Sequence, residues 1–539
     1  MFRTIATLVT SAALLVLASA RADSPVTIPL VPDQPWQSKI DPGLLVAPQT
    51  GPIEFLLVLT EQADLGKAEL LPDKLARTTY VYETLREVAD RTQGALVQAL
   101  TASGSHFRPF WVANMLWVRA DPRILQRLAA RSDVMRIIPN PQVRFQEPSR
   151  SPGLVPQAKA ASSIEWNLIK IAAPELWHRG FRGQGIVIGG QDTGYQWDHP
   201  ALINQYRGWD GQTADHHYNW HDAIHSGNGL CGHDAPAPCD DDRHGTHTMG
   251  TMVGDDGGTN QIGMAPGARW IGCRNMNEGM GSPASYAECY QWFIAPTDLA
   301  DNNPDPAKAP DVINNSWGCT PGEGCTYPEI LRQVVQNVRA AGILTVHSAG
   351  NEGPDCSTVG EPAGIYEESF SIGATDADDQ IADFSSRGPV TVDGSGRLKP
   401  NVTAPGVDIR SSVPGSGYEG GWSGTSMAAP HVAGMAALLL SAQPALKGRV
   451  DTLETLIEKS ALALTTPENC GGVSGIAIPN NTYGWGRVDA LAGYQGLTPT
   501  PIPTLAAWAK ILLAMLLLGT ATRYGWRRSG RGQNFTEQP

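Results

Sequence analysis

One serine in this chain stands where a hydroxyl can act as a nucleophile. Residues 424–434 read Gly-Thr-Ser-Met-Ala-Ala-Pro-His-Val-Ala-Gly, and small or apolar residues continue to Leu440. A helix that is apolar on all sides is a buried one, so we expect a central core helix over 426–440 that begins at Ser426. The free N–H groups and the positive dipole end of a helix start favour an oxyanion formed beside that hydroxyl. Since an isolated serine at a helix start is usually only a cap, the interpretation depends on partners elsewhere.

Two further stretches supply the acid and the base that a serine nucleophile needs. Residues 186–194 read Ile-Val-Ile-Gly-Gly-Gln-Asp-Thr-Gly, an apolar strand that ends in the carboxylate of Asp192. Residues 244–250 read His-Gly-Thr-His-Thr-Met-Gly, with His244 first. A neutral hydroxyl becomes a strong nucleophile when an imidazole takes its proton and a carboxylate orients that imidazole. Each residue alone has an ordinary structural explanation, but together the three predict attack on a carbonyl.

These three stretches, in this order, resemble the motifs of the subtilisin-like serine peptidases, the subtilases. The resemblance implies that Ser426 attacks a peptide carbonyl, that His244 takes and returns the proton, and that Asp192 holds the His244 tautomer. It also implies that Asn351, in the Ala-Gly-Asn that follows an apolar strand, donates its amide to the oxyanion together with the Ser426 backbone N–H.

The resemblance extends to two segments that bind the substrate. In the family, the segment that corresponds to Asn-Asn-Ser-Trp-Gly pairs with the substrate backbone, which implies that Ser316, Trp317 and Gly318 lie at the main specificity pocket. Trp317 either narrows that pocket or belongs to the core. Pro362 and Ala363 resemble the opposite wall. Neither segment carries an acidic residue inside its motif, so the sequence does not indicate a demand for basic substrates.

Histidines and aspartates near His244 raise the question of a metal site. His247 follows three residues later, and five more histidines stand in the stretch just upstream, at positions 216, 217, 221, 225 and 233. Neither the His-Glu-x-x-His of a metallopeptidase nor the regular spacing of structural zinc occurs, so we expect no metal or other cofactor in catalysis. The acidic run 240–242 is a candidate structural calcium site, although its spacing is not that of a calcium loop.

Composition and cysteine content narrow the class of protein. The 539 residues carry 40 basic and 53 acidic side chains, a formal charge of −13, which argues against a nucleic-acid partner. All eight cysteines lie between positions 231 and 470, and behind an export signal they predict disulfides. The pairs Cys231/Cys239 and Cys319/Cys325 would each close a short loop, but the sequence alone does not fix the pairing.

The first third of the chain divides into three segments. Residues 1–22, with a basic start, a short apolar run and small residues at the end, predict a secretory signal peptide. Residues 48–145 resemble the inhibitory propeptide of subtilases, a small α+β (ferredoxin-like) domain. Within it we expect strands at 55–59, 111–120 and 134–138 and helices at 74–100 and 122–130. Residues 146–165 are rich in proline, serine and alanine and predict a processing linker.

The catalytic body is expected over 166–495. Alternating strands and helices predict a mostly parallel sheet covered on both faces, which is the three-layer α/β/α fold that the subtilisin-like resemblance also implies. We expect strands at 186–190, 270–272, 312–316 and 344–348, and helices at 282–294, 328–340 and 426–440. Within the family, the stretches at 166–167, 289–293 and 312–318 are most similar to the bacillopeptidase F-like branch.

The end of the chain differs in character. Residues 496–501 form a Pro/Thr spacer, and residues 502–531 join Ile-Pro-Thr-Leu, an apolar run and a basic end. This pattern resembles the IPTL-type C-terminal sorting signal of Gram-negative bacteria. The resemblance implies an exosortase-like sorting enzyme as a partner, membrane contact only through the C-terminal helix before processing, and a place at the cell envelope or surface, or release from it. A retained membrane-spanning helix is the alternative.

Together these features predict a secreted serine endopeptidase that is made as a self-processed zymogen. Its partners would be protein or peptide substrates and its own propeptide, which would act as an inhibitor. The alternative is a non-catalytic cell-surface binding protein on a peptidase scaffold, in which a triad or oxyanion residue would be replaced; here all four are present. An acyl hydrolase of another fold would carry the motif Gly-x-Ser-x-Gly around its nucleophile, whereas here Ala428 occupies the position of the second glycine.

Overall fold

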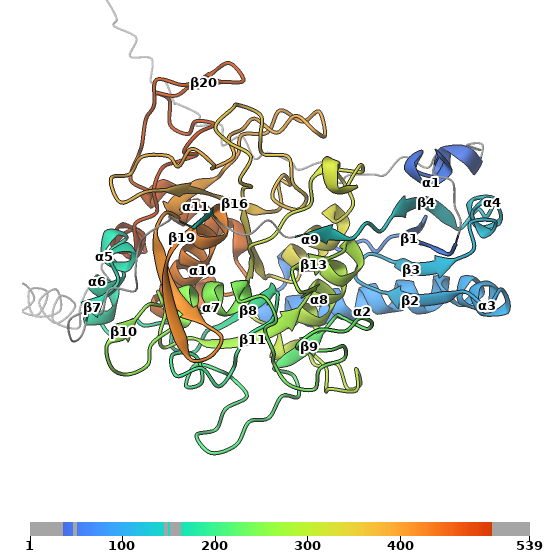
Figure 1. The fold of residues 1–539 in the computed structure, drawn as a ribbon, viewed down its shortest axis with the longest axis horizontal. Coiled ribbons are helices and arrows are strands. Elements are labelled where there is room, and N and C mark those ends of the chain that lie inside the picture. Colours follow the sequence, from blue (N-terminus) through green and yellow to red (C-terminus); the bar gives the residue numbers. More distant parts are fainter. Residues whose placement is uncertain (1–35, 47–50, 145–148, 151–162, 498–539) are drawn as a thin grey trace, which may run out of the picture.

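The computed structural model describes residues 36–46, 51–144, 149–150 and 163–497. Figure 1 shows a large body that carries most of the chain and a smaller unit beside it, formed by the blue N-terminal part. The signal peptide expected at 1–22 and the sorting signal expected at 502–531 lie outside the described residues, as does most of the expected processing linker.

A seven-stranded sheet forms the centre of the large body. Its order is β17-β16-β15-β14-β8-β11-β9, and all of its ladders are parallel. Nearly every residue in it is buried, as expected for a sheet with helices on both faces. The strands are β8 (Val187–Asp192), β9 (Trp220–Asp222), β11 (Arg269–Arg274), β14 (Val312–Asn315), β15 (Leu344–Ser348), β16 (Phe370–Thr375) and β17 (Val402–Pro405).

Helices cover the two faces of this sheet and enclose two separate cores. Neighbouring residues of β14 point to opposite sides, since Val312 packs in one core and Ile313 in the other. The first core contains α7 (His244–Val253) and α10 (Thr425–Ala442), and the second contains α8 (Pro283–Ile294) and α9 (Arg332–Ala340). The predicted three-layer α/β/α fold is therefore confirmed.

The helix that begins at the predicted nucleophile is α10. Of the described helices, only α10 is long and apolar enough to cross a membrane, and 94% of it is buried inside the protein, so it serves as a core helix. The remaining helices of the body are α5 (Trp166–Lys170), α6 (Ala173–His178), α11 (Val450–Ser460) and α12 (Ala490–Gly496). Its short strands are β7 (Ser163–Ile164), β10 (Asn260–Gln261), β12 (Met276–Asn277), β13 (Met280–Gly281), β18 (Ile409–Val413), β19 (Gly417–Ser423), β20 (Asn469–Cys470) and β21 (Val473–Ser474).

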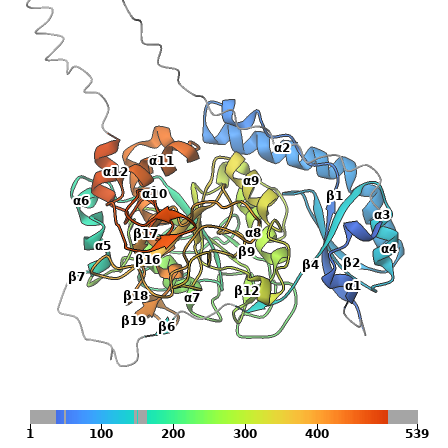
Figure 2. The same cartoon turned by 90° about the horizontal axis from the view of Figure 1, so that it is seen from above.

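The smaller unit is an antiparallel four-stranded sheet with helices. Its order is β2-β3-β1-β4, which together with the chain order of strands and helices is the ferredoxin-like arrangement. Its elements are β1 (Ile53–Leu59), α2 (Lys74–Thr92), α3 (Gly94–Ala102), β2 (His106–Phe110), β3 (Met115–Ala120), α4 (Ile124–Ala129) and β4 (Val134–Pro139). Figure 2 shows α2 lying along the body beside α9.

Two details of this unit differ from the sequence prediction. The helix expected over 74–100 is two helices, because Gln93 ends α2 and its amide donates to the carbonyl of Phe110 at 2.9 Å. The strand expected over 111–120 begins only at Met115, and a further strand, β2, precedes it. Pro109 lies in β2, at the edge of the sheet. An edge strand tolerates proline because the backbone on its outer side pairs with no further strand and needs no N–H donor there.

All eight cysteines form disulfides. The two short-loop pairs, Cys231–Cys239 and Cys319–Cys325, are those that the sequence proposed as candidates. The other two join distant segments: Cys273–Cys289 ties β11 to α8, and Cys356–Cys470 spans 114 residues. The prediction of disulfides is thus confirmed.

Candidate active site

Two of the predicted catalytic residues meet where β8 ends and α7 begins. Asp192 is the last residue of β8 and His244 is the first of α7. His244 Nδ1 lies 2.7 Å from Asp192 Oδ1, and their side chains are 0% and 1% exposed. Asp192 also accepts from the Thr193 backbone N–H at 2.7 Å and from the Thr248 hydroxyl at 3.2 Å. Because the ionised carboxylate only accepts, Nδ1 of His244 carries the proton and Nε2 keeps its lone pair.

A buried aspartate fixes the start of α7. Asp240 accepts from the backbone N–H groups of Arg243 at 2.8 Å and Thr246 at 2.9 Å, so it caps this helix. Its carboxylate also accepts from the Thr193 hydroxyl at 2.9 Å, next to Asp192. Asp240 therefore ties the end of β8 to the start of α7 and sets the distance between Asp192 and His244.

The environment of His244 makes its imidazole a stronger base than usual. Burial lowers the pKa of His244, but the Asp192 carboxylate more than offsets this, and the carboxylates of Asp242 and Asp240 act in the same direction. The pKa of His244 therefore lies above its ordinary value. The other histidine of this motif, His247, differs. Its ring stacks on that of Trp422, with 4.4 Å between the ring centroids, and burial holds the pKa of His247 well below its usual range.

Ser426 lies in the first turn of α10, which packs against α7. Its hydroxyl donates to the backbone carbonyl of Ser316 at 3.2 Å, and the Ser316 hydroxyl donates to the backbone carbonyl of Ser426 at 3.0 Å. Within the described chain the Ser426 hydroxyl thus bonds to Ser316 and not to His244. Proton transfer to His244 requires this hydroxyl to turn, and catalytic hydrogen bonds commonly tighten only when substrate is bound.

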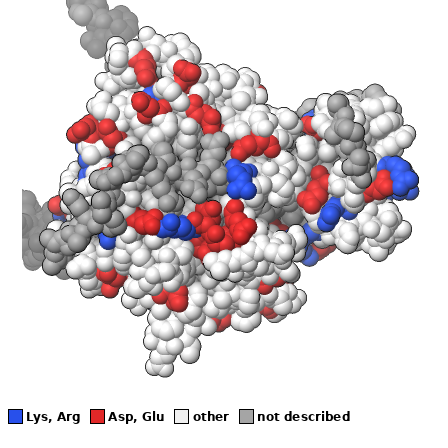
Figure 3. All heavy atoms as spheres, viewed as in Figure 1, with Lys and Arg blue, Asp and Glu red and all other residues white. Residues whose placement is uncertain are grey.

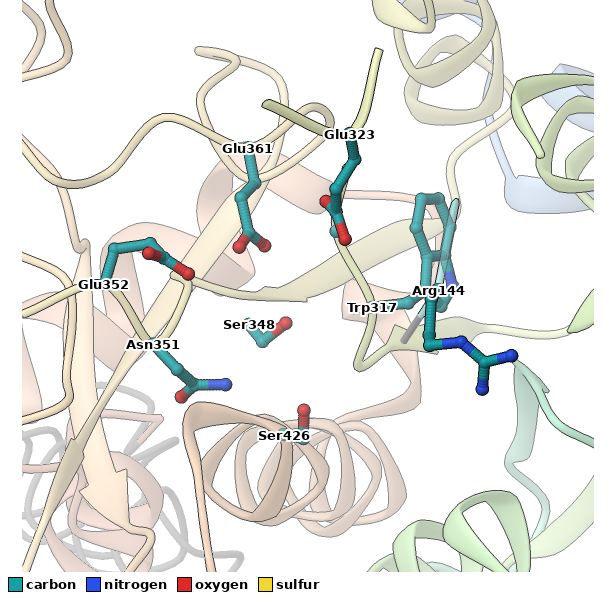
Figure 4. A pocket seen from close by; sticks show the side chains of 9 residues that line it. Arg144, Trp317, Glu323, Ser348, Asn351, Glu352, Glu361 and Ser426 are labelled. Atoms are coloured by element: carbon teal, nitrogen blue, oxygen red, sulfur yellow. The ribbon is translucent and has the colours of Figure 1, made fainter. Parts of the chain in front are cut away.

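Asn351 is held with its amide N–H₂ facing the same place. Its Oδ1 accepts from the Thr425 backbone N–H and from the Thr425 hydroxyl, both at 2.9 Å. A backbone N–H can only donate, so these bonds identify the oxygen and leave the nitrogen on the other side. Figure 4 shows that nitrogen directed towards the space above Ser426. An amide donor beside a hydroxyl at a helix start is an arrangement that can stabilise an oxyanion.

A cavity opens beside Ser426 and is lined by some of the predicted site residues (Figure 4). Its volume is about 380 Å³ including the open mouth. The described residues that line it are Arg144, Trp317, Gly318, Glu323, Ser348, Asn351, Glu352, Glu361 and Ser426. Four of these are predicted site residues, and five are not.

Of the two predicted walls of the pocket, the structure places one at the cavity and the other behind it. Trp317 lines the cavity and also belongs to the core, since it is 3% exposed and stacks on Tyr286 at 3.9 Å. Pro362 and Ala363 are buried and are not among the lining residues; the residue before them, Glu361, is. Glu352 likewise follows Asn351 directly. Both glutamates adjoin a predicted site residue in the sequence, so their place at the cavity could have been predicted from that position. Glu323 adjoins no predicted site residue, and nothing in the sequence indicated its place at the cavity.

The polypeptide that leaves the smaller unit reaches this site. β5 (Val143–Arg144) pairs antiparallel with β13, which places Arg144 opposite Met280 and at the cavity. β6 (Ser149–Arg150) pairs antiparallel with β19, which places its first residue opposite Ser423, three residues before Ser426. Both strands therefore lie beside the candidate nucleophile.

Two carboxylates of the acidic run before His244 already bond to other groups of the chain. Besides the capping role of Asp240, Asp241 pairs with Arg274 at 3.2 Å and accepts from the Glu278 backbone N–H at 2.9 Å. Among the described residues, no group of three or more His, Cys, Asp or Glu side chains is arranged to hold a metal ion. Structural calcium thus stays a prediction that nothing here tests.

Comparison with known proteins agrees with this geometry. Residues 183–486 match the model of the Subtilase family. Bacillopeptidase F of Bacillus subtilis (strain 168) is 38% identical over 463 residues, which cover 81% of this chain and 30% of that protein. Subtilisin E of the same strain and subtilisin of Bacillus pumilus are each 32% identical to this chain over 287 residues, which cover 53% of it. The match covers 63% of subtilisin E and 87% of the Bacillus pumilus subtilisin. The match thus spans less than a third of bacillopeptidase F and less than two thirds of subtilisin E. The family model covers more than half of the chain, and the chain therefore belongs to the subtilase family.

Proposed function

We propose that this protein is a serine endopeptidase that hydrolyses peptide bonds in protein or peptide substrates with Asp192, His244 and Ser426. The observation that carries the proposal is the Asp192–His244 hydrogen bond, made next to a helix start at which Ser426 and the Asn351 amide face one cavity. The family membership of the chain supports it further.

The chemistry follows from the positions of these groups. His244 Nε2 takes the proton of the Ser426 hydroxyl as Oγ attacks the carbonyl carbon, and Asp192 stabilises the imidazolium that forms. The negative charge on the carbonyl oxygen is met by the Asn351 N–H₂ and by the backbone N–H of Ser426. His244 then returns the proton to the leaving amine, and water releases the acyl group by the same steps in reverse order. No cofactor enters the reaction.

The smaller unit acts, in this proposal, as an inhibitory propeptide. Its α2 binds the body through Lys74, whose ammonium donates to Asp311 at 3.0 Å and to the carbonyls of Ala309 and Pro310. Arg108 pairs with Glu288 at 2.6 Å. Since β5 and β6 lie beside Ser426, the chain that follows this unit is placed to block substrates until the enzyme cuts it in the 146–165 linker.

The contact between the two units gives a measurable prediction. The Gln291 side chain accepts from the backbone N–H groups of Trp111 at 2.6 Å and Val112 at 3.2 Å. Gln291→Ala leaves both donors without this partner, and we expect the cleaved propeptide to dissociate roughly 10-fold faster or more. The lag before peptide hydrolysis begins in freshly processed enzyme measures this rate. Gln380→Ala, on an exposed loop, should leave the lag unchanged, and an unchanged lag in Gln291→Ala would contradict the proposed contact.

The proposed location rests on the two ends of the chain. The signal-like segment 1–22 and the four disulfides favour export, because disulfides persist in oxidising compartments. The segment 502–531 favours a Gram-negative envelope or surface, with an exosortase-like enzyme removing the C-terminal helix, or release into the medium.

Covalent labelling tests the peptidase proposal directly. A fluorophosphonate should modify Ser426 in the processed protein, because only a serine activated by its imidazole reacts at a useful rate. Peptide mapping locates the label, and His244→Ala should abolish it while leaving the fold intact by circular dichroism. Folded, processed protein that resists the reagent would instead favour a non-catalytic binding protein on this scaffold.

A further inference from the structure

Three glutamates from different loops face the cavity beside Ser426. Glu323 belongs to the short helix η4 (Pro321–Glu323), Glu352 follows Asn351, and Glu361 precedes Pro362. Figure 4 shows their carboxylates directed into the space above Ser348 and Ser426. The residue whose carbonyl meets Ser426 and the Asn351 amide has its side chain nearest to this space, so these carboxylates face the residue on the amino side of the cut bond.

The cavity wall is shaped to hold the carboxylate of Glu361. A side chain at Gly318 would place its Cβ 1.6 Å from Glu361 Oε2, and one at Gly350 would meet Glu361 Cδ at 3.4 Å. Gly350 has φ +102, a conformation that glycine adopts without strain. Gly318 thus leaves the room that this carboxylate occupies, whereas a Cβ at Gly350 would make only an ordinary contact with it. Among the described residues, no hydrogen bond or ion pair engages it.

The loop that carries Glu323 is fixed in two ways. The disulfide Cys319–Cys325 closes it, and Glu323 Oε2 accepts from the backbone N–H and the hydroxyl of Thr320 at 2.8 and 2.9 Å. These bonds leave the second oxygen of Glu323 available to a ligand. Glu323 is therefore a positioned acceptor and not a freely moving surface acid.

The negative charge of this cavity is not balanced by its own wall. Arg144 is the only basic side chain among the described lining residues, it is exposed, and its guanidinium points away from the three glutamates (Figure 4). Burial above all, together with the carboxylates of Glu352 and Glu323, raises the pKa of Glu361 to about 8. A cationic ligand relieves this repulsion and supplies the missing partner, whereas an apolar one would bury the acids unpaired.

One face of the molecule also carries a group of acidic side chains. On the face seen in Figure 3, acidic side chains gather over the middle of the body, and the chain as a whole carries a formal charge of −13. Such a field attracts cationic segments of a substrate before they reach the cavity.

We propose that this cavity is a cation-binding specificity pocket, in which Glu361, Glu323 and Glu352 select lysine or arginine on the amino side of the cleaved bond. The inference rests on the proposed peptidase function and goes beyond the sequence analysis, in which the binding motifs did not indicate a demand for basic substrates. The sequence analysis considered only residues inside the two binding motifs; Glu361 directly precedes one of them, Glu352 follows Asn351, and Glu323 lies on a separate loop.

Matched peptides test this proposal in the processed enzyme. Peptides that differ only at the residue before the cut, carrying Arg, Lys, Leu or Phe, should give the highest kcat/KM for Arg and Lys. At pH 9, where Glu361 is mostly ionised, Glu361→Gln should lower kcat/KM for the Arg peptide about 10- to 100-fold, the range for a charged hydrogen-bonded pair, and change the Leu peptide by less than threefold. Glu361→Asp, which keeps the charge, should recover part of the loss, while Glu367→Gln, at an exposed position on the same loop, should change neither.

The pH profile supplies a second readout. Because the pKa of Glu361 is about 8, the charged fraction of its carboxylate grows as pH increases from 7 to 9, and the ratio of kcat/KM for Arg over Leu should rise with it. Taking the ratio cancels the titration of His244, which affects both peptides, and arginine keeps its charge throughout. In Glu361→Gln this rise should be lost.

The outcomes separate this proposal from the peptidase proposal. Wild-type enzyme that prefers Leu or Phe, or a Glu361→Gln variant that loses the Arg and Leu peptides equally, would overturn the cation pocket while leaving the peptidase function in place. Failure to cleave every peptide, together with no labelling of Ser426, would overturn both.

Discussion

Replacing Ser426 by alanine is expected to lower kcat for peptide hydrolysis about a million-fold, the size of the effect known for subtilisin. The substitution removes the only atom that forms the acyl bond, and it costs the fold little. The lost hydroxyl makes one 3.2 Å bond to the Ser316 carbonyl, whereas the bond from the Ser316 hydroxyl to the Ser426 backbone remains. Steady-state kinetics on a chromogenic peptide measures the loss.

The same variant reports on maturation. If the enzyme cuts its own linker, Ser426→Ala accumulates as the uncut precursor, which gel electrophoresis and N-terminal sequencing detect. Ser441→Ala, at the other end of α10, removes a hydroxyl that donates to the Leu438 carbonyl at 2.7 Å and should mature and turn over within a few-fold of wild type. Normal processing of Ser426→Ala would rule out self-cleavage, and more than a thousandth of wild-type activity would rule out Ser426 as the nucleophile.

The second large effect is expected at Asn351. Asn351→Ala removes the amide donor that faces the Ser426 cavity, so kcat should fall about 10²- to 10³-fold with little change in KM, because the donor acts on charge that develops only in the transition state. Measuring kcat and KM separately on one peptide distinguishes this from a loss of binding.

Thr425 and a surface asparagine provide controls for that experiment. Thr425→Val keeps the backbone N–H that holds Asn351 Oδ1 and removes only the hydroxyl donor, so it should cost far less than Asn351→Ala. Asn302→Ala, on an exposed loop, should cost nothing. A rise in KM with unchanged kcat in Asn351→Ala would assign Asn351 to substrate binding and not to the oxyanion.

The sequence was most informative where a short motif fixes local geometry. Asp192 at a strand end and His244 at a helix start each sit in an unbroken stretch, and the Asp240 carboxylate, which bonds to both ends, brings them together. The apolar stretch after Ser426 likewise predicted a buried helix, because its composition leaves no polar face.

What the sequence did not predict depends on contacts between distant residues. β16 reads Phe-Ser-Ile-Gly-Ala-Thr and gives no strong strand signal, because Gly373 must admit the Thr403 side chain of β17, to which its Cβ would come within 3.0 Å. β17 itself is only four residues long and ends at Pro405. The disulfide Cys356–Cys470 joins a loop to β20 across 114 residues, and the sequence around neither cysteine indicates its partner.

The glutamates of the cavity illustrate the same limit for the site. Glu352 and Glu361 are sequence neighbours of predicted residues, yet only the folded chain brings their side chains to one space with Glu323. A specificity pocket is built from loops, and loops converge through the fold of the whole body and not through spacing along the chain.

The burial of α10 has a consequence for the lifetime of the enzyme. A backbone enclosed on every side exchanges its amide hydrogens, or meets another protease molecule, only when the surrounding body opens as a unit. The peptide bonds around the nucleophile are thus the last that a neighbouring copy of the enzyme can cut. Self-digestion must begin at exposed loops, and activity is lost when the whole body unfolds.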